Sequence, residues 1–355
     1  MPATLPRPTE IATALARRVI GQKEALREMS IALAKKLAGL PVGNVLMIGS
    51  SGTGKTTLMR AVEEYLASDP QLAAGSLLIR IHANVLAEEA VEGRAGETVL
   101  LRLLERAREQ AGEPADAGEL LARVSGATVF VDEVDKIRSR VGDSTQTAGI
   151  RAQEALLTLI ENEAVPLALP GWAGGGVRTV DASGILFVAA GAFEGLYDAV
   201  YDRVTIGRDR GDLQAVNIVE GDEVRQEIRF RLRDWLRNED LFDYGMTPQF
   251  LSRFDAVVTL EDLGVDELVH IFLGSPESGL HQAEAYFEAH GIRLELSPAA
   301  TLRIAGEAAR QPRLGARALN EVFRRVIRAH EYEPRPGEDG RLVIDLPAVE
   351  AVLGR

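Results

Sequence analysis

A short stretch of the chain combines glycines, a lysine and a threonine at a spacing that can hold phosphate. It reads Gly49-Ser50-Ser51-Gly52-Thr53-Gly54-Lys55-Thr56, which fits the pattern G-x-x-x-x-G-K-[ST]. Glycines let the backbone curl so that several N–H groups point at phosphate oxygens, and a helix that begins near Lys55 adds the positive end of its dipole. Lys55 would place a cation on the β- and γ-phosphates, and the hydroxyl of Thr56 would bind Mg²⁺. The segment therefore predicts a site for a nucleoside triphosphate with magnesium.

Two carboxylates further along the chain could complete this chemistry. Asp132 and Glu133 follow the apolar run from Thr128 to Val131. An aspartate at the end of a buried strand can hold the magnesium shell through water. A glutamate one residue later can polarise the attacking water as a general base. We expect Asp132 to take the first role and Glu133 the second.

Strands and helices that could position these residues alternate along the chain. Five short apolar runs suit buried strands of a parallel sheet: Asn44 to Ile48, Leu77 to His82, Ala127 to Asp132, Gly184 to Ala190 and Ala256 to Leu260. Helical patterns separate or precede them: Thr57 to Ser68, Thr98 to Gln110, Ile150 to Glu163, and Pro8 to Leu37 with a break at Val19–Gln22. The alternation predicts an α/β fold with a mostly parallel sheet.

The rest of the chain is less regular. The glycine- and proline-rich segment from Pro166 to Asp181 indicates an exposed loop. The segment from Tyr197 to Asp243 is irregular and charged, and within it Arg229 to Trp235 favours a solvated helix face over a basic binding helix. After residue 263 the pattern becomes helical, which predicts a domain over 1–263 and a second, mainly helical one over 264–355. The elements expected in the second domain are Val265 to Leu273, Gly279 to His290, Pro298 to Glu307, Ala316 to Tyr332, a strand from Arg341 to Asp345 and a last helix.

Composition excludes several classes of function. The chain has no cysteine, which rules out disulfides and thiol nucleophiles, and its five histidines show no metal-ligand spacing. The net charge of −13 argues against tight non-specific binding of nucleic acid. No apolar run approaches the ~18 residues of a membrane-spanning helix. Met1 to Glu10 lacks the pattern of a signal peptide, so we expect a cytoplasmic protein without a membrane partner.

These motifs, in this order, resemble the ClpX-type AAA+ unfoldases. The segment from Val129 to Ile137 resembles their Walker B strand, Ile185 to Leu196 their sensor-1 strand, and Val19 to Gln22 their adenine-side box. The resemblance runs from about residue 9 to the C-terminus, and no large inserted domain of the HslU kind is visible. It implies a P-loop NTPase domain with a central parallel sheet and a small helical C-terminal domain. It also implies a homo-oligomeric ring, expected to be hexameric, that hydrolyses ATP with Mg²⁺ to remodel a polypeptide.

The resemblance assigns roles to individual residues. Arg253, within the segment from Thr247 to Phe254, would be the arginine finger that reaches the γ-phosphate of a neighbouring subunit. Arg317, within Leu314 to Leu319, would be the sensor-2 arginine. The expected catalytic set is Lys55, Asp132, Glu133, Arg253 and Arg317, and the expected magnesium ligands are Thr56 and Asp132. The expected nucleotide contacts are Val19, Ile20, Gly49, Ser50, Ser51, Gly52, Thr53, Gly54, Lys55, Thr56, Thr57 and Arg317.

The sequence departs from the family in three segments. Where the family has a Gly-Tyr-Val-Gly pore loop, this chain has Gly93-Arg94-Ala95-Gly96, so Arg94 either grips acidic or phosphate-bearing substrates or the loop has lost its gripping role. Where the family has an Ile/Leu-Gly-Phe tripeptide that docks a protease, Ile206-Gly207 is followed by Arg208, which makes a ClpP-type peptidase partner doubtful. The zinc-binding N-terminal domain is not expected, because the chain has no cysteine.

Three readings of function remain open at this point. The first is a ClpX-like ATPase that unfolds or remodels a protein without an attached protease. The second is an AAA+ nucleic-acid motor or clamp-type ATPase that uses a basic pore loop at Arg94. The third is a nucleotide switch that assembles with ATP without acting as a motor, which the Asp132–Glu133 pair and Arg253 argue against.

Overall fold

The computed structural model describes residues 5–68, 72, 77–112, 116–161, 164–206, 215–220, 223–228, 230–337 and 339–354. The chain forms two compact units. The first contains the residues up to Ala14, Glu24–Ile48 and Met59–Thr259, and the second contains Leu15–Lys23, Gly49–Leu58 and the chain from Leu260 onward. The phosphate-binding segment thus belongs to the second unit, while Asp132 and Glu133 belong to the first. The domain boundary at residue 263 stays a prediction.

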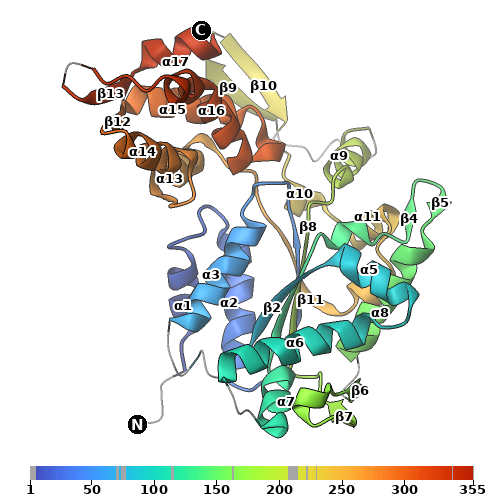
Figure 1. Ribbon diagram of the computed structural model, residues 1–355. Helices are drawn as coiled ribbons and strands as arrows, with labels where there is room; N and C mark the ends of the chain where they lie inside the picture. The colour runs from blue at the N-terminus through green and yellow to red at the C-terminus, as the bar shows by residue number, and fades with distance from the viewer. Residues whose placement is uncertain are drawn as a thin grey trace. The chain divides into compact units, whose positions relative to one another are not determined.

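A five-stranded parallel sheet forms the centre of the first unit. Its strands are β1 (Asn44–Ile48), β2 (Leu78–His82), β3 (Thr128–Asp132), β8 (Leu186–Gly191) and β11 (Phe254–Thr259). They lie in the order β11-β1-β8-β3-β2, and every neighbouring pair is parallel (Figure 1). All residues of β1, β3 and β8 are buried, as expected for a parallel sheet covered on both faces. The five strands and the α/β class predicted from the apolar runs are confirmed.

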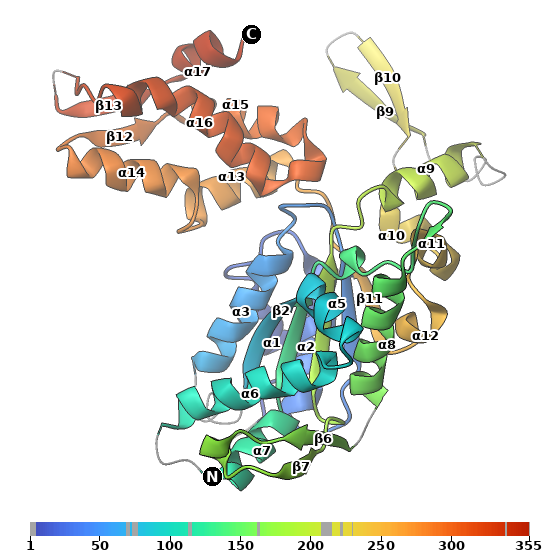
Figure 2. The same cartoon turned by 45° about the vertical axis from the view of Figure 1, so that its right-hand side comes forward.

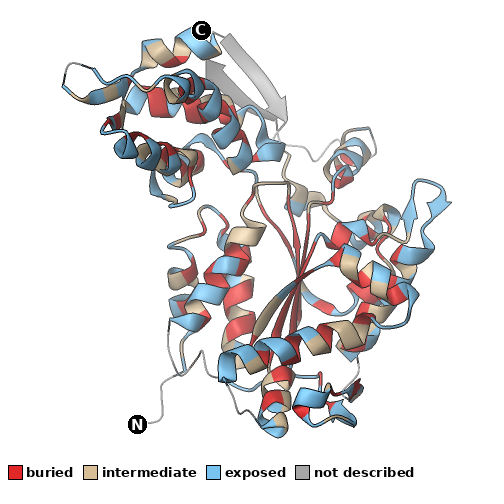
Figure 3. Cartoon of the chain, in the orientation of Figure 1, coloured by how far each residue is buried: buried red, intermediate tan, exposed pale blue. Residues whose placement is uncertain are grey.

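Helices cover both faces of this sheet. On one face, α5 (Ala83–Val91), α6 (Ala95–Ala111) and α8 (Thr147–Glu161) enclose a core to which every second residue of β2 and β3 contributes. The helices α1 (Pro8–Leu15) and α2 (Lys23–Leu37) lie across the sheet from them (Figure 2). The buried positions follow the sheet and the inner faces of the helices (Figure 3). The inner strands of the sheet are therefore covered by two helical layers, and their ends remain available for chemistry. Further elements of this unit are α7 (Ala117–Ser125), β4 (Arg140–Val141), β5 (Ser144–Thr145) and α12 (Pro248–Leu251).

The expected loop over Pro166 to Asp181 is wrong. The structure has an antiparallel hairpin there, formed by β6 (Val165–Ala168) and β7 (Val177–Val180). Leu167 and Val180 enter the core, while Pro170 and three consecutive glycines make the turn between the strands. The glycines and proline dominate the composition of the segment and hide two short strands on either side of them.

The segment from Tyr197 to Asp243 contains more regular structure than its sequence predicts. It includes α9 (Leu196–Ile206), β9 (Ala215–Glu220), β10 (Glu223–Ile228), α10 (Leu232–Trp235) and α11 (Asn238–Tyr244). The helix expected over Arg229 to Trp235 is restricted to α10, with Phe230 and Arg231 in extended or irregular backbone before it. Arg229 lies outside the described residues.

The C-terminal part of the second unit is mainly helical, as predicted. It contains α13 (Val265–Gly274), α14 (Gly279–Ala289), β12 (Arg293–Leu296), α15 (Pro298–Ala309), α16 (Ala316–Tyr332), β13 (Arg341–Ile344) and α17 (Leu346–Leu353). The side chains of Ser278, Ser297 and Asp345 cap three of these helices by accepting a backbone N–H in the first turn. The strand β12, which the sequence reading missed, pairs in parallel with β13. Across the described parts of both units, none of the helices combines the length and the apolar character needed to cross a bilayer.

Candidate nucleotide site

The phosphate-binding segment forms a tight turn that leads into α3 (Lys55–Ala67). Gly52 and Gly54 have φ angles of +75° and +104°, which residues with a side chain rarely adopt. A Cβ atom on Gly52 would lie 2.2 Å from the carbonyl oxygen of Leu314. Glycine at this position therefore allows both the curl of the loop and the close approach of another backbone.

The ammonium group of Lys55 lies against the inside of the turn. It donates to the carbonyl oxygens of Gly49 and, at 2.8 Å, of Ser50. Thr53 is buried, and its hydroxyl donates to the same Ser50 oxygen at 2.9 Å. A cation held at the centre of a curled loop that opens a helix fits a phosphate group. Thr56 and Thr57 follow in the first turn of α3.

The adenine-side box is joined to this turn by Gln22. Its amide nitrogen donates to the carbonyl oxygens of Thr53 at 3.0 Å and Glu261 at 2.8 Å, and its amide oxygen accepts the N–H of Glu261 at 2.9 Å. Gln22 is buried with all three hydrogen bonds formed, so the contact is rigid. Val19 is buried and Ile20 half-buried beside it. The structure thus brings the Val19–Gln22 segment and the phosphate-binding turn together.

The start of α16 also meets the phosphate-binding turn. The N–H of Ala316 donates to the carbonyl oxygen of Gly52 at 3.2 Å. Gly315 has a φ angle of +50°, and a Cβ atom there would lie 2.6 Å from the same oxygen. Arg317 is the second residue of α16, and its side chain is exposed. The predicted sensor-2 segment therefore contacts the turn through a backbone hydrogen bond.

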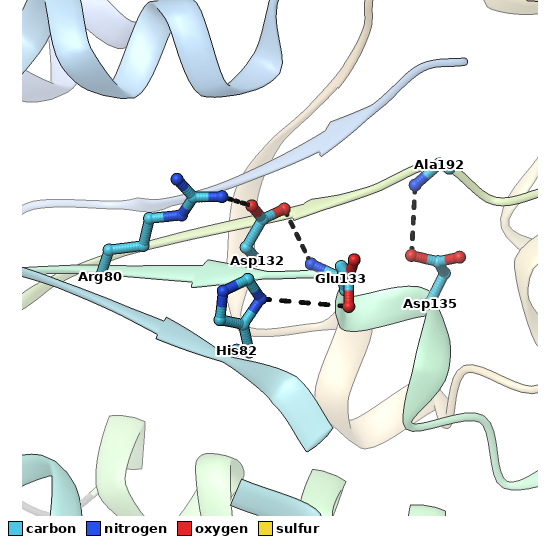
Figure 4. Close-up of polar contacts among 6 residues, drawn as sticks. All are labelled: Arg80, His82, Asp132, Glu133, Asp135 and Ala192. Atoms are coloured by element: carbon cyan, nitrogen blue, oxygen red, sulfur yellow. Dashed lines mark hydrogen bonds and ion pairs between the residues drawn. The ribbon is translucent and has the colours of Figure 1, made fainter. Parts of the chain in front are cut away.

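In the first unit, Asp132 and Glu133 stand at the carboxyl end of β3. Asp132 is buried, and one carboxylate oxygen accepts the N–H of Glu133 at 2.9 Å (Figure 4). Glu133 has a left-handed φ angle of +58°, which is uncommon for a residue with a side chain and turns its carboxylate out of the strand. One carboxylate is thus buried and hydrogen-bonded, while its neighbour is exposed.

Two residues of β2 that the sequence reading did not single out face these carboxylates. The guanidinium of Arg80 donates to the second oxygen of Asp132, and the Nδ1 atom of His82 lies 4.0 Å from Glu133 Oε2 (Figure 4). His82 stands opposite Asp132 in the parallel register of the two strands. The signal that could have found them is the placement of an arginine and a histidine within an otherwise apolar strand.

A buried carboxylate ties the end of β3 to the end of β8. Asp135 accepts the N–H of Ala192 at 3.1 Å, and burial raises the pKa of its carboxyl group. A Cβ atom on Gly191 would lie 2.6 Å from Asp135 Oδ1, so the last residue of β8 must be small. The predicted sensor-1 strand therefore ends beside the predicted Walker B segment.

Arg253 stands at the start of the edge strand β11, three strands away from β3, whose far end carries Asp132. It precedes β11, and its carbonyl oxygen accepts a hydrogen bond of 2.9 Å from Asn44, the first residue of β1. Asp132 is the last residue of β3, which runs parallel to β1 and β11 through β8. The side chain of Arg253 is ion-paired with Glu161 at the end of α8. The structure does not bring Arg253 to Asp132 or Glu133 of its own chain.

The predicted pore loop is shorter than its sequence suggests. Gly93, with a φ angle of +72°, and Arg94 connect α5 to α6, while Ala95 and Gly96 already belong to the first turn of α6. Arg94 is ion-paired with Glu89, at 3.3 Å, and with Glu92. Its charge is thus partly compensated within the chain. Of the predicted docking segment, Ile206 ends α9 and is 82% exposed, and Gly207 and Arg208 lie outside the described residues.

Comparison with known proteins agrees with this architecture. Residues 40–257 match the family described as AAA domain (Cdc48 subfamily). The ATP-dependent Clp protease ATP-binding subunit ClpX 3 of Methylococcus capsulatus is 30% identical over 374 residues, covering 98% of this chain and 81% of that protein. The chain belongs to the ClpX-type AAA+ ATPases. A ClpX of Porphyromonas gingivalis is 29% identical with 98% of this chain covered and 83% of that protein, and ClpX 2 of Wolinella succinogenes is 28% identical with 91% and 76% covered. The AAA+ ATPase fold and the Clp-type chaperone class predicted from the motifs are confirmed, and the roles of individual residues stay predictions.

Proposed function

We propose that this AAA+ protein unfolds or remodels a polypeptide by hydrolysing ATP at the interfaces of a homo-oligomeric ring, expected to be hexameric. The observation that carries the proposal is the placement of Arg253 at the start of the edge strand β11, three strands away from β3, whose far end carries Asp132 and Glu133. An arginine finger that stands apart from Asp132 and Glu133 of its own chain supports a role at the site of a neighbouring subunit. Hydrolysis would then depend on assembly.

ATP binding is assigned to the phosphate-binding turn and the segments around it. The N–H groups of Gly49 to Thr57 and the ammonium of Lys55 would hold the phosphates, with Lys55 exchanging its contacts to the loop carbonyls for phosphate oxygens. Val19 and Ile20 would contact the base. Arg317, exposed at the start of α16, would contact the phosphates and link the C-terminal part of the chain to the nucleotide.

Magnesium is assigned to Thr56 and Asp132. A buried carboxylate at a strand end and a hydroxyl at a helix start are hard oxygen donors, which suit this ion. When bound, Mg²⁺ neutralises charge on the β- and γ-phosphates.

Glu133 and Arg253 are assigned the chemical step. The Glu133 carboxylate, exposed and held in a left-handed turn, would accept a proton as the oxygen of water attacks the γ-phosphorus. The bond from the γ-phosphorus to the bridging oxygen breaks, and its electron pair leaves with ADP. Arg253 of the neighbouring subunit would neutralise the charge that develops on the transferred group.

We further propose that the protein works without a ClpP-type peptidase, although its relatives are named as subunits of a Clp protease. The proposal rests on Arg208, which stands where the docking tripeptide of the family has an aromatic anchor. A nucleic-acid motor is less well supported, because Arg94, the basis of that reading, is paired with two glutamates.

Subunit mixing tests the interface directly. Arg253→Ala and Glu133→Gln subunits should each be inactive alone, while a 1:1 mixture should recover roughly a quarter of the sites, because one interface in four then joins an intact Glu133 to an intact Arg253. Phosphate release and oligomeric state by light scattering, both with Mg·ATP, are the measurements. A mixture as inactive as its components, or a wild-type protein that hydrolyses ATP as a monomer, would overturn the proposal. A pull-down with Glu133→Gln, compared with wild type, should then enrich a protein substrate.

A further inference from the structure

Arg80 lies beside Asp132, the carboxylate that is assigned to magnesium. It lies on β2, an edge strand of the sheet, and its alternation with the buried Ile81 puts its side chain on the opposite face from the core of α5 and α6. In the parallel register, Arg80 stands opposite Phe130, two residues before Asp132 on β3. This diagonal spacing lets a long side chain reach the carboxylate at the strand end.

Each carboxylate oxygen of Asp132 already accepts one hydrogen bond. One oxygen accepts the guanidinium of Arg80, and the other accepts the N–H of Glu133 (Figure 4). The side chain of Asp132 is 10% exposed and that of Arg80 is 38% exposed, so the pair is less screened by water than a fully exposed one. A magnesium ion, or a water of its shell, that binds Asp132 would therefore meet a cation already bound to one of its oxygens.

We propose that Arg80 is a tethered counter-ion of Asp132 that Mg²⁺ displaces, and that it thereby sets the magnesium concentration at which the nucleotide site fills. This inference rests on the proposed role of Asp132. A guanidinium attached to the neighbouring strand competes at an effective concentration on the order of millimolar. The ion pair also neutralises Asp132 while the site is empty, which removes the cost of a buried unpaired carboxylate.

The test measures binding rather than turnover. The half-saturating Mg²⁺ concentration for binding of a fluorescent ADP analogue is determined at a fixed nucleotide concentration. Arg80→Gln should lower that concentration about fivefold, since it removes the competing cation. Arg80→Lys keeps the charge but loses the planar guanidinium, so its half-saturating Mg²⁺ concentration should lie between those of wild type and Arg80→Gln. Arg106→Gln removes the same charge from an exposed pair with Glu109 on α6 and should change nothing.

A double-mutant cycle separates competition from a general effect of charge. In an Asp132→Asn background, Arg80→Gln should no longer shift the half-saturating Mg²⁺ concentration, because the carboxylate for which Arg80 and Mg²⁺ compete is absent. An unchanged or raised half-saturating concentration in Arg80→Gln, at wild-type melting temperature, would overturn the inference. If Arg80→Gln does not fold, the same comparison is made with Arg80→Lys alone.

The outcomes also separate this inference from the proposed function. If neither Lys55→Ala nor Asp132→Asn changed nucleotide binding, the assigned site itself would be contradicted. Binding that depends on Lys55, Asp132 and magnesium, yet is indifferent to Arg80→Gln, would leave the site in place and remove only the counter-ion.

Discussion

Arg253 is ion-paired with Glu161, the last residue of α8, at the edge of the sheet where β1 and β11 begin. The two side chains are 46% and 38% exposed, so the pair contributes little to stability and can be exchanged at low cost. In a ring, the guanidinium would leave Glu161 for the phosphate of a neighbour. Glu161 thus compensates the charge of the proposed finger at the surface.

Removal of the finger should separate ATP binding from hydrolysis. Arg253→Ala should reduce kcat by about 10³-fold or more, because the charge on the transferred phosphoryl group is no longer neutralised. Nucleotide affinity should stay within about twofold of wild type, since the finger is assigned to charge that develops only in the transition state. Phosphate release and fluorescent-nucleotide binding measure the two quantities. Normal turnover in this variant would take Arg253 out of the finger role.

Breaking the ion pair between Arg253 and Glu161 should increase ATP hydrolysis, whereas loss of Arg253 should reduce it. Glu161→Gln removes a competitor for the guanidinium, so hydrolysis below saturating ATP should rise, by at most about fivefold for a partly exposed pair. Glu119→Gln breaks a comparable pair with Arg123 on α7 and provides the control. A Glu161→Gln variant with reduced turnover would show instead that Glu161 is needed to position Arg253 at the interface.

The sheet strands and the phosphate-binding turn could be predicted because residues that are close in sequence determine both. The runs that became β1, β3 and β8 are short, mostly apolar and fully buried, and the glycine spacing around Lys55 is compatible with few backbone conformations. The hairpin of β6 and β7 was missed because its local sequence pattern is misleading. Its strands are four residues each, and the glycines of the turn dominate the local composition.

The ion pairs at the site could not be predicted, because they depend on strand order. Arg80 reaches Asp132 only because β2 is the neighbour of β3, and Arg253 reaches Glu161 only because α8 ends near the start of β11. Periodicity identifies strands and helices but not which of them are neighbours. Partners separated by tens of residues in sequence are therefore visible only once the fold is known.

The contact between the phosphate-binding turn and α16 can be tested through glycine. Gly52→Ala places a Cβ atom 2.2 Å from a backbone oxygen of Leu314 at a φ angle of +75°, which should cost about 1–3 kcal/mol of unfolding free energy. Nucleotide affinity should fall with it. Gly306→Ala in α15 has open space around its Cβ and should stabilise by about 0.5–1 kcal/mol. Denaturant unfolding of the two variants should thus give changes of opposite sign, and equal changes would contradict the tight packing of the turn.

Lys36, near the end of α2, should make stability depend on pH in the alkaline range. Its ammonium donates to the carbonyl oxygens of Gly126 and Ala127 at 2.5 and 2.6 Å, and burial lowers its pKa from 10.5 to about 8. Between about pH 8 and pH 10.5 the unfolded chain binds more protons at this residue than the folded chain does. The free energy of unfolding should therefore rise with pH through that window, relative to its value below pH 8. The measurement is the difference in unfolding free energy between wild type and Lys36→Met, which has no group to titrate there. A difference that stays constant from pH 7 to pH 10.5 would show that Lys36 keeps its ordinary pKa and that its amine is solvated in the folded protein.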